Sequence, residues 1–414
     1  MRSVLRRALD PLLPVGRFTS FDRRLVLIIW VAGVVQGFGQ SQASAGLPFT
    51  RVGLGLSEGE MSLMLGLARL AAFAALPIGW LGDHRGRRRP FLVAMTLVVI
   101  GGSLAGLAVE AWQFGLFHAV LRTGTAAASA LAVVILAESV SVPIRAYAIS
   151  FFGAAVSFGS GLALMALPLA DGGGQAWRTP HLIVGVGLLV LPFLVKRVPE
   201  SIVYVDDPEG GHWRDLATGP WARRFWTVIV INLLASAYGA VGAAFSTERM
   251  IEDVGMSTGD TVIALLVGGT VGAAGFFVGG HLADAWGRRR TSIVSLLLTI
   301  AGGLTLYTST SIPVIVVAAM VSSFGTFAFV PSGGSHRAEL FPTGLRASAN
   351  TAATNGALVG SALGLISGIY TIDTFGLSNT VYVLAVGVAI AAALTATLPE
   401  TRGQDLTAVD AARR

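Results

Sequence analysis

The sequence predicts an all-α membrane protein with twelve transmembrane helices in two pseudo-symmetric six-helix bundles. Its composition is 53% hydrophobic and 13% charged, with a mean hydropathy of +0.71, which a soluble globular chain does not show. A charged stretch from Gly79 to Arg89, GWLGDHRGRRR, returns 201 residues later as GHLADAWGRRR, from Gly280 to Arg290. Each copy lies between two apolar runs that are long enough to cross a bilayer. The two copies therefore indicate a duplicated membrane domain.

The glycines of the two charged turns predict how each turn is built. Gly86 and Gly287 are expected to permit the bend, because glycine adopts backbone conformations closed to other residues. Gly79 and Gly280 are expected to let neighbouring helices approach closely. The 52 glycines of the chain also suit helices that pack through small residues.

The charge of the chain fits a membrane protein better than a nucleic-acid-binding protein. The net charge is +6 and the pI is about 10.3, but the basic residues are scattered through short turns rather than gathered on one face. The chain has no cysteine, which excludes disulfides, thiol catalysis and cysteine-bound metal. It has no nucleophile-and-base grouping, metal-ligand spacing or phosphate-binding glycine loop, so we expect neither an enzyme nor a cofactor.

The apolar runs divide the chain into five segments. These are a cytoplasmic tail (1–24), a first bundle (25–198), a polar cytoplasmic linker (199–224), a second bundle (225–398) and a cytoplasmic tail (399–414). Spans of roughly 20 residues, the length that crosses a hydrocarbon core, are expected in the first bundle near 25–47, 61–82, 91–109, 112–137, 147–169 and 179–197. In the second bundle they are expected near 225–246, 260–282, 291–309, 312–335, 348–371 and 377–397.

The basic residues predict the orientation of these spans. The outer segments hold only three of the 29: Arg51, Arg178 and Arg249. Two more, Arg69 and Arg122, fall inside spans, and the others, Arg337 among them, lie on the opposite side. Because basic residues accumulate on the cytoplasmic side, both termini are expected in the cytoplasm of a multi-pass inner or plasma membrane protein.

Further matched motifs carry a resemblance to a known family. Glu138 and Arg145, between the fourth and fifth spans, recur as Glu339 and Arg346, and Pro-Glu-Ser or Pro-Glu-Thr closes each half. Together with the paired turns, these motifs resemble the major facilitator superfamily over essentially the whole chain. AELFPTGLR from Ala338 and the final PETRG are most similar to the sugar porters and the related organic ion transporters. The resemblance implies a central substrate cavity and alternating access by rocking one bundle against the other.

The resemblance also implies a gating network of charges on the cytoplasmic side, which holds the outward-open state shut on the inside. Its residues are Asp83, Arg87, Glu138, Arg145, Asp284, Arg288, Glu339 and Arg346. Topological anchoring by positive charge is the alternative for each arginine. Anchoring does not explain the two aspartates, since it needs no acid.

Arginines inside the spans predict the chemistry of the substrate. Arg122 lies about ten residues into the fourth span and Arg69 about eight into the second, where a charge is costly and needs a partner or an aqueous cavity. His118 shares a helix face with Arg122, one turn before it. None of the 23 acidic residues falls near the centre of a span. A cavity of positive potential favours an organic anion, with Arg122 as the principal contact and Arg69 as the secondary one.

Neutral polar residues at similar depth complete the expected substrate site, although helix packing is the alternative for each: Gln36, Gln40, Asn232, Tyr238 and Asn355. We expect a monomer that binds a small-molecule substrate and the lipid bilayer but no nucleic acid. Export of a drug-like or lipidic compound, facilitated transport of a sugar or polyol, and a non-transporting sensor are the alternatives. Coupling to a proton or to a counter-anion is left open, because the first span lacks the acid usual in proton-coupled sugar porters.

Overall fold

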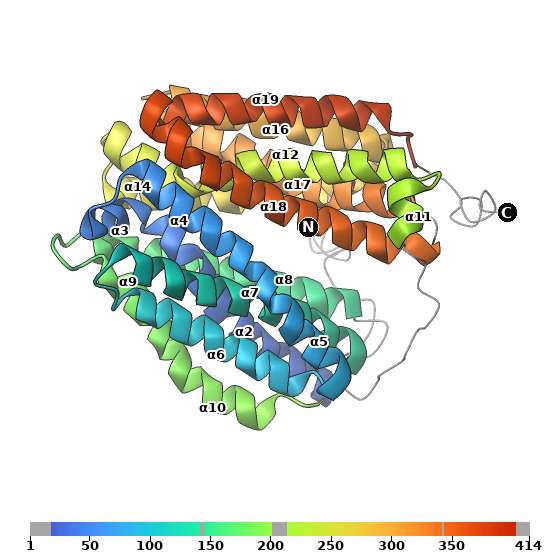
Figure 1. Ribbon diagram of the computed structural model, residues 1–414, viewed down its shortest axis with the longest axis horizontal. Helices are drawn as coiled ribbons and strands as arrows, with labels where there is room; N and C mark the ends of the chain where they lie inside the picture. The colour runs from blue at the N-terminus through green and yellow to red at the C-terminus, as the bar shows by residue number, and fades with distance from the viewer. Residues whose placement is uncertain (1–17, 141–144, 201–212, 342, 403–414) are drawn as a thin grey trace, which may run out of the picture. The chain divides into compact units, whose positions relative to one another are not determined.

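The described part of the chain is helical. The computed structural model describes residues 18–140, 145–200, 213–341 and 343–402, and no β-strand occurs among them (Figure 1). Eleven helical stretches within these residues are long and apolar enough to cross a membrane. The remaining predicted span corresponds to α8, whose apolar part runs over Phe151–Met165. The predicted all-α fold is therefore confirmed.

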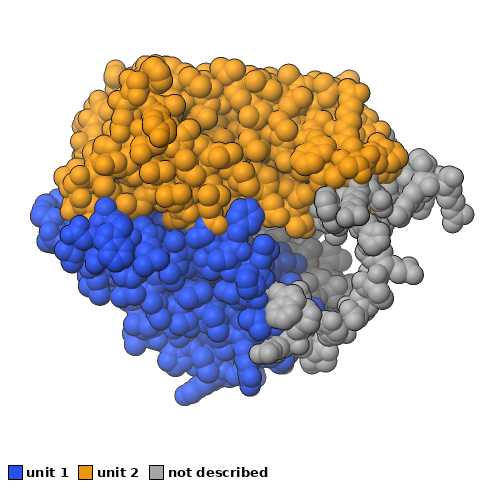
Figure 2. Space-filling model, in the orientation of Figure 1, with its two compact units in different colours: residues 1–46, 71–206 blue, residues 47–70, 207–414 orange. Residues whose placement is uncertain are grey.

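The first compact unit comprises Met1–Gly46 and Ala71–Asp206 (Figure 2). Its helices are α2 (Ser20–Ala45), α5 (Ala75–Arg85), α6 (Arg88–Ala105), α7 (Ala111–Ser139), α8 (Arg145–Met165), α9 (Arg178–Ile183) and α10 (Gly187–Arg197), with 3-10 turns η2 (Ala71–Ala74), η4 (Leu167–Ala170) and η5 (Val184–Val186). α2 packs along α8, and α6 packs along α7. The core between them is apolar and contains the buried Leu25, Ile29 and Phe91.

The second compact unit comprises Leu47–Leu70 and Asp207–Arg414 (Figure 2). Its helices are α3 (Leu47–Leu54), α4 (Glu58–Leu70), α11 (Trp213–Thr218), α12 (Ala222–Ala244), α13 (Ser246–Glu248), α14 (Thr258–Gly272), α15 (Ala274–Trp286), α16 (Arg288–Thr308), α17 (Ile312–Glu339), α18 (Thr343–Phe375) and α19 (Leu377–Thr397), with a π-helical turn η6 (Arg249–Asp253). α12 and α4 both pack against α18, and α16 packs against α17. By chain order, Leu47–Leu70 belongs with the first repeat, although it packs within the second unit. We call it the outer strap, because it begins with the segment that the sequence analysis predicts on the outer side.

Close helix crossings reproduce the repeat at atomic level. A Cβ atom on Gly101 would lie 2.5 Å from the backbone nitrogen of Leu121, and one on Gly302 would lie 2.3 Å from that of Ser322. Both partners of the second pair stand 201 residues after those of the first. No side chain fits at either crossing, so glycine lets α6 approach α7 and lets α16 approach α17 in the same way. The pseudo-symmetry is therefore present in the packing as well as in the sequence.

One local expectation needs correction. A Cβ on Gly79 would have no described atom within 4 Å, and one on Gly280 would meet only Pro331, at 3.8 Å, so these two glycines do not mark close helix crossings. The predicted second span is present over Glu58–Gly79, and within it η2 separates α4 from α5. Pro77 explains this break, since it has no N–H to donate one turn back and its ring crowds that carbonyl.

Candidate functional site

A cavity in the second unit gathers polar groups at membrane depth. Its volume is about 580 Å³, and α4, α12, α16, α17, α18 and α19 contribute to its wall. Its polar lining consists of Arg69, Asn232, Ser236, Thr299, Thr326, Arg337 and Ser361. No aspartate or glutamate is among the described lining residues, so the two arginines give the cavity a positive charge.

Arg69 is where the sequence places it, inside the second span and facing this cavity. It lies one residue before the end of α4, which is held against α18. The side chain is half-buried, and its buried Nε has no hydrogen-bond partner among the described residues. A guanidinium without a carboxylate partner is costly at membrane depth. The cavity therefore suits a ligand that brings a negative charge.

Arg337 was expected in a cytoplasmic segment, and the structure places it on the cavity wall instead. α17 continues past the expected end of its span to Glu339, which carries Arg337 into the membrane-spanning helix. Its Nη1 donates a hydrogen bond of 2.9 Å to Oδ1 of Asn232. The sequence carries no clear signal for this extension, and the predicted span ends at residue 335, two residues before Arg337.

The other second-unit candidates divide between the cavity and the helix packing. Asn232 lines the cavity, and its Nδ2 donates 2.8 Å to the carbonyl of Val228 on the same helix. Tyr238 is buried, its hydroxyl lies 3.5 Å from the carbonyl of Thr299, and it is outside the described lining. Asn355 is exposed on α18 and is also outside that lining.

Three of the four substrate-site candidates in the first unit take part in hydrogen bonds: Arg122, His118 and Gln36. Nε of Arg122 lies 3.4 Å from Nε2 of His118, and the fully buried His118 ring stacks on Phe114 with centroids 5.9 Å apart. Gln36 is buried and donates to the carbonyl of Thr125 at 3.2 Å, and it also contacts the hydroxyl of Ser129. Gln40 is half-buried on α2.

The paired charged turns hold matching ion pairs in both units. Arg87 donates to Glu138 at 3.1 Å and to the carbonyl of Gly82 at 2.6 Å. At the equivalent position, Arg288 pairs with Glu339 at 3.1 Å and donates to the carbonyl of Ala283 at 3.0 Å. Arg288 also contacts Asp284 at 2.8 Å. The side chains of the remaining network candidates lie outside the described residues: Asp83, Arg145 and Arg346.

The closing Pro-Glu motifs cap helices, a role that the sequence analysis did not assign. Oε1 of Glu400 accepts backbone N–H bonds from Arg288 at 2.8 Å and Arg289 at 3.4 Å, where α16 begins. Oε1 of Glu200 accepts the backbone N–H of Arg88 at the start of α6, at 3.1 Å. Burial acts to raise the pKa of Glu400, but backbone hydrogen bonds outweigh it, so this pKa lies below its usual value.

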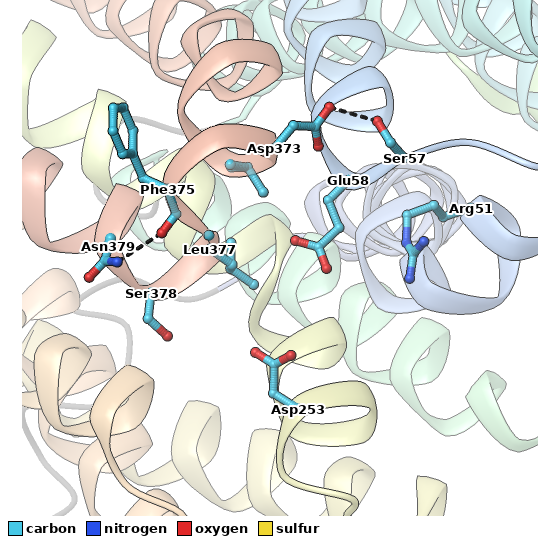
Figure 3. Close-up of a pocket in the computed structure, with 11 residues that line it drawn as sticks. Arg51, Ser57, Glu58, Asp253, Asp373, Phe375, Leu377, Ser378 and Asn379 are labelled. Atoms are coloured by element: carbon cyan, nitrogen blue, oxygen red, sulfur yellow. Dashed lines mark hydrogen bonds between the residues drawn. The ribbon is translucent and has the colours of Figure 1, made fainter.

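The outer strap is bound to the rest of the second unit by a buried ion pair. Nε of Arg51, on α3, donates 2.8 Å to Oε1 of Glu248, which is 0% exposed. Burial raises the pKa of Glu248 to about 7, although the hydrogen bond and the charge of Arg51 lower it. Arg51 lines a pocket of about 620 Å³ together with the carboxylates of Glu58, Asp253 and Asp373. Figure 3 shows these side chains.

Asp373 at the end of α18 makes a second attachment of the strap. It accepts hydrogen bonds of 2.9 Å from the hydroxyl of Ser57 and 2.9 Å from the backbone N–H of Gly59 (Figure 3). Deeper along α4, the hydroxyl of Ser62 donates 2.6 Å to the carbonyl of Leu365. The strap is therefore joined to α13 and α18 by polar contacts along much of its length.

The sequence profile of the Major Facilitator Superfamily matches residues 29–284 and 233–413 of this chain. The chain belongs to the major facilitator superfamily. It is accordingly a multi-pass membrane transporter and not an enzyme, as the sequence analysis predicts. The paired turns and closures that suggested the superfamily are the same elements that form the matching ion pairs and helix caps.

Two curated transporters of Escherichia coli (strain K12) are similar to this chain. The 3-(3-hydroxy-phenyl)propionate transporter is 28% identical over 221 residues, 50% of this chain and 51% of that protein, so the match spans about half of its length. The sialic acid transporter NanX is 22% identical over 288 residues, 67% of this chain and 68% of that protein. A solved bacterial homologue of the human lysosomal transporter Spinster, inward-facing and occupied, has a TM-score of 0.75 at 18% identity, covering 92% of this chain and 97% of its own.

Proposed function

We propose that this chain is a secondary transporter that moves a small organic anion across the inner membrane by alternating access, with both termini in the cytoplasm. The observation that supports it most is Arg69, an arginine at membrane depth that lines a cavity without a carboxylate among its described lining. In such a site, an anionic group supplies the missing counter-charge and the missing acceptor.

The rest of the cavity wall suits an organic rather than an inorganic anion. Apolar and small side chains make up most of it, including Ala235, Ala240, Leu296, Phe329 and Val388. Pockets of this composition bind a hydrocarbon body and orient it through a few polar groups. Both similar transporters of Escherichia coli are named for organic acids, which agrees with the charge of the cavity.

This proposal reverses the order of the two arginines that the sequence analysis names as anion contacts, Arg122 and Arg69. Arg122 was expected as the principal anion contact, but its Nε faces the buried His118. Among the described residues, Arg69 makes no hydrogen bond or ion pair, and its buried Nε is without a partner. Arg69 therefore becomes the principal carboxylate contact, and Arg122 a secondary group in the first unit.

Transport by the purified full chain in liposomes tests this assignment. A panel of aromatic carboxylates, sugars, polyols and cationic dyes distinguishes anion transport from the sugar and drug alternatives. Arg69→Gln should lower kcat/KM for the best anion about 10- to 100-fold, as expected when a hydrogen bond to a charged group is lost. Arg89→Gln, which removes an exposed arginine from the first cytoplasmic turn, is the matched control. Preferred uptake of cations, or full anion transport by Arg69→Gln, would refute the proposal.

A further inference from the structure

A second arginine, Arg337, lines the cavity, and it is held by a neutral side chain and not by a carboxylate. Nη1 of Arg337 donates to Oδ1 of Asn232 at 2.9 Å, and the buried Nε of Arg337 has no partner among the described residues. Asn232 is neutral, so it orients the guanidinium without cancelling its charge. Because Nδ2 of Asn232 is bound to the carbonyl of Val228, its amide oxygen is directed to Arg337.

Two acidic residues could be expected to pair with Arg337, Glu339 two residues later and Glu400 in the closing motif, but both bind other groups. Glu339 accepts from Arg288 and from the hydroxyl of Thr401, at 3.1 and 2.5 Å. Glu400 accepts the backbone N–H groups at the start of α16. No ion pair of Arg337 occurs within the part of the chain that the structure describes. Its positive charge therefore adds to that of Arg69 in the same cavity.

A cargo with a single negative charge would leave one of these two guanidinium groups without a counter-charge. In a low-dielectric site such a residual charge is unfavourable, while a second anionic group on the cargo would remove it. The wall that the two arginines share is largely apolar, with Phe329, Val330 and Leu296. This favours a cargo whose two charged groups are separated by a hydrocarbon body.

We propose that Arg337, held in position by Asn232, is a second anion-binding group, and that the preferred cargo is an organic dianion of the dicarboxylate type with an apolar middle. The inference rests on the proposed function in one respect, since it takes Arg69 as the contact for the first carboxylate. Arg337 then sets the specificity, and Asn232 is a positioning residue that acts through it.

Two cargoes with one skeleton test the inference: 3-phenylpropionate and 3-(3-carboxyphenyl)propionate, which differ by one carboxylate. In liposomes, the unmodified chain should transport the dicarboxylate with the higher kcat/KM. Arg337→Gln should lower that preference about tenfold or more, chiefly through KM for the dicarboxylate, while monocarboxylate transport persists. Asn232→Ala should lower the preference partly, and Arg337→Lys should retain part of it. Asn350→Ala, an exposed asparagine on α18, is the control.

The ratio of the kcat/KM values for the two cargoes distinguishes a change in specificity from a loss of folded protein, because a damaged fold lowers transport of both. If Arg337→Gln does not fold, Arg337→Lys and a thermal-shift titration with each cargo give the same comparison. A preference for the monocarboxylate, or an unchanged ratio in Arg337→Gln, would overturn the inference. If Arg69→Gln abolishes transport of both cargoes and Arg337→Gln changes nothing, the proposed function stands and this inference fails. If Arg69→Gln leaves both unchanged, the proposed function itself fails.

Discussion

The attachment of the outer strap should depend on pH through Glu248. Its carboxyl is 0% exposed while Arg51 is bound, and burial raises its pKa from 4.5 to about 7. When the strap is released, the carboxyl meets water and its pKa returns toward the ordinary value. Between these two values, the bound form holds more protons than the released form. Binding of the strap therefore strengthens as pH falls through this window and weakens as pH rises.

The size of this effect follows from the two pKa values. Across the whole window, the difference corresponds to about 3 kcal/mol, at 1.36 kcal/mol per pKa unit. Between about pH 8.5 and about pH 5.5, protonation is incomplete and the gain is about 2 kcal/mol, or about 30-fold in the equilibrium between bound and released strap. Arg51 does not reverse the sign, since its favourable contribution is already part of the raised pKa of Glu248.

A thiol-labelling assay can measure the release, because the chain has no cysteine of its own. Ser62→Cys places a thiol at a fully buried strap position, and Val52→Cys, at a 63% exposed position on α3, corrects for the pH dependence of the reagent. With a membrane-impermeant reagent, the corrected rate at Ser62→Cys should be up to about 30-fold higher at about pH 8.5 than at about pH 5.5.

Two variants decide whether Glu248 is responsible. Glu248→Gln mimics the protonated carboxyl, so labelling should be slow at both pH values, while Glu252→Gln, at an exposed position four residues later, should keep the dependence. A corrected rate that does not change with pH, or a dependence that survives in Glu248→Gln, would refute the reasoning.

The helix cap formed by Glu400 provides two stability predictions, both measured by thermal unfolding. Glu400→Gln should destabilise the chain by about 1–2 kcal/mol, because the charged acceptor at the start of α16 is lost, whereas Glu252→Gln should change little. Since the pKa of Glu400 is lowered, its contribution is present above the ordinary pKa of a glutamate and is lost as pH falls through the lowered value. Gly287→Ala should cost about 1–3 kcal/mol, because φ is 114° there and the new Cβ would lie 2.5 Å from the Glu400 carboxylate. In the matched Gly280→Ala the new Cβ would meet only Pro331, at an ordinary contact distance of 3.8 Å, so this variant should cost less than about 1 kcal/mol; equal losses in both glycine variants would contradict this account.

The sequence predicted the fold because its signals are long and repeated. Twenty-residue apolar runs and motifs that return after 201 residues depend on few atomic details. The cavity depends on finer details. Arg69 could be found by counting residues into a span, but Arg337 required knowing that α17 continues to Glu339, past the predicted end of its span at residue 335. The Arg51–Glu248 pair could not be found at all, since nothing local in the sequence shows which outer charges meet across 197 residues.

The outer strap also bears on how the chain is made. It is synthesised early, yet the groups that bind it come later, at separations of 197, 303 and 316 residues for Glu248, Leu365 and Asp373. Contacts this distant in sequence form slowly. Until the second repeat has been made, neither the ion pair of Arg51 with Glu248 nor the hydrogen bond from Ser62 to Leu365 can form. Attachment of the loop after the first span, and of the first half of the second span, is thus tied to completion of the last third of the chain.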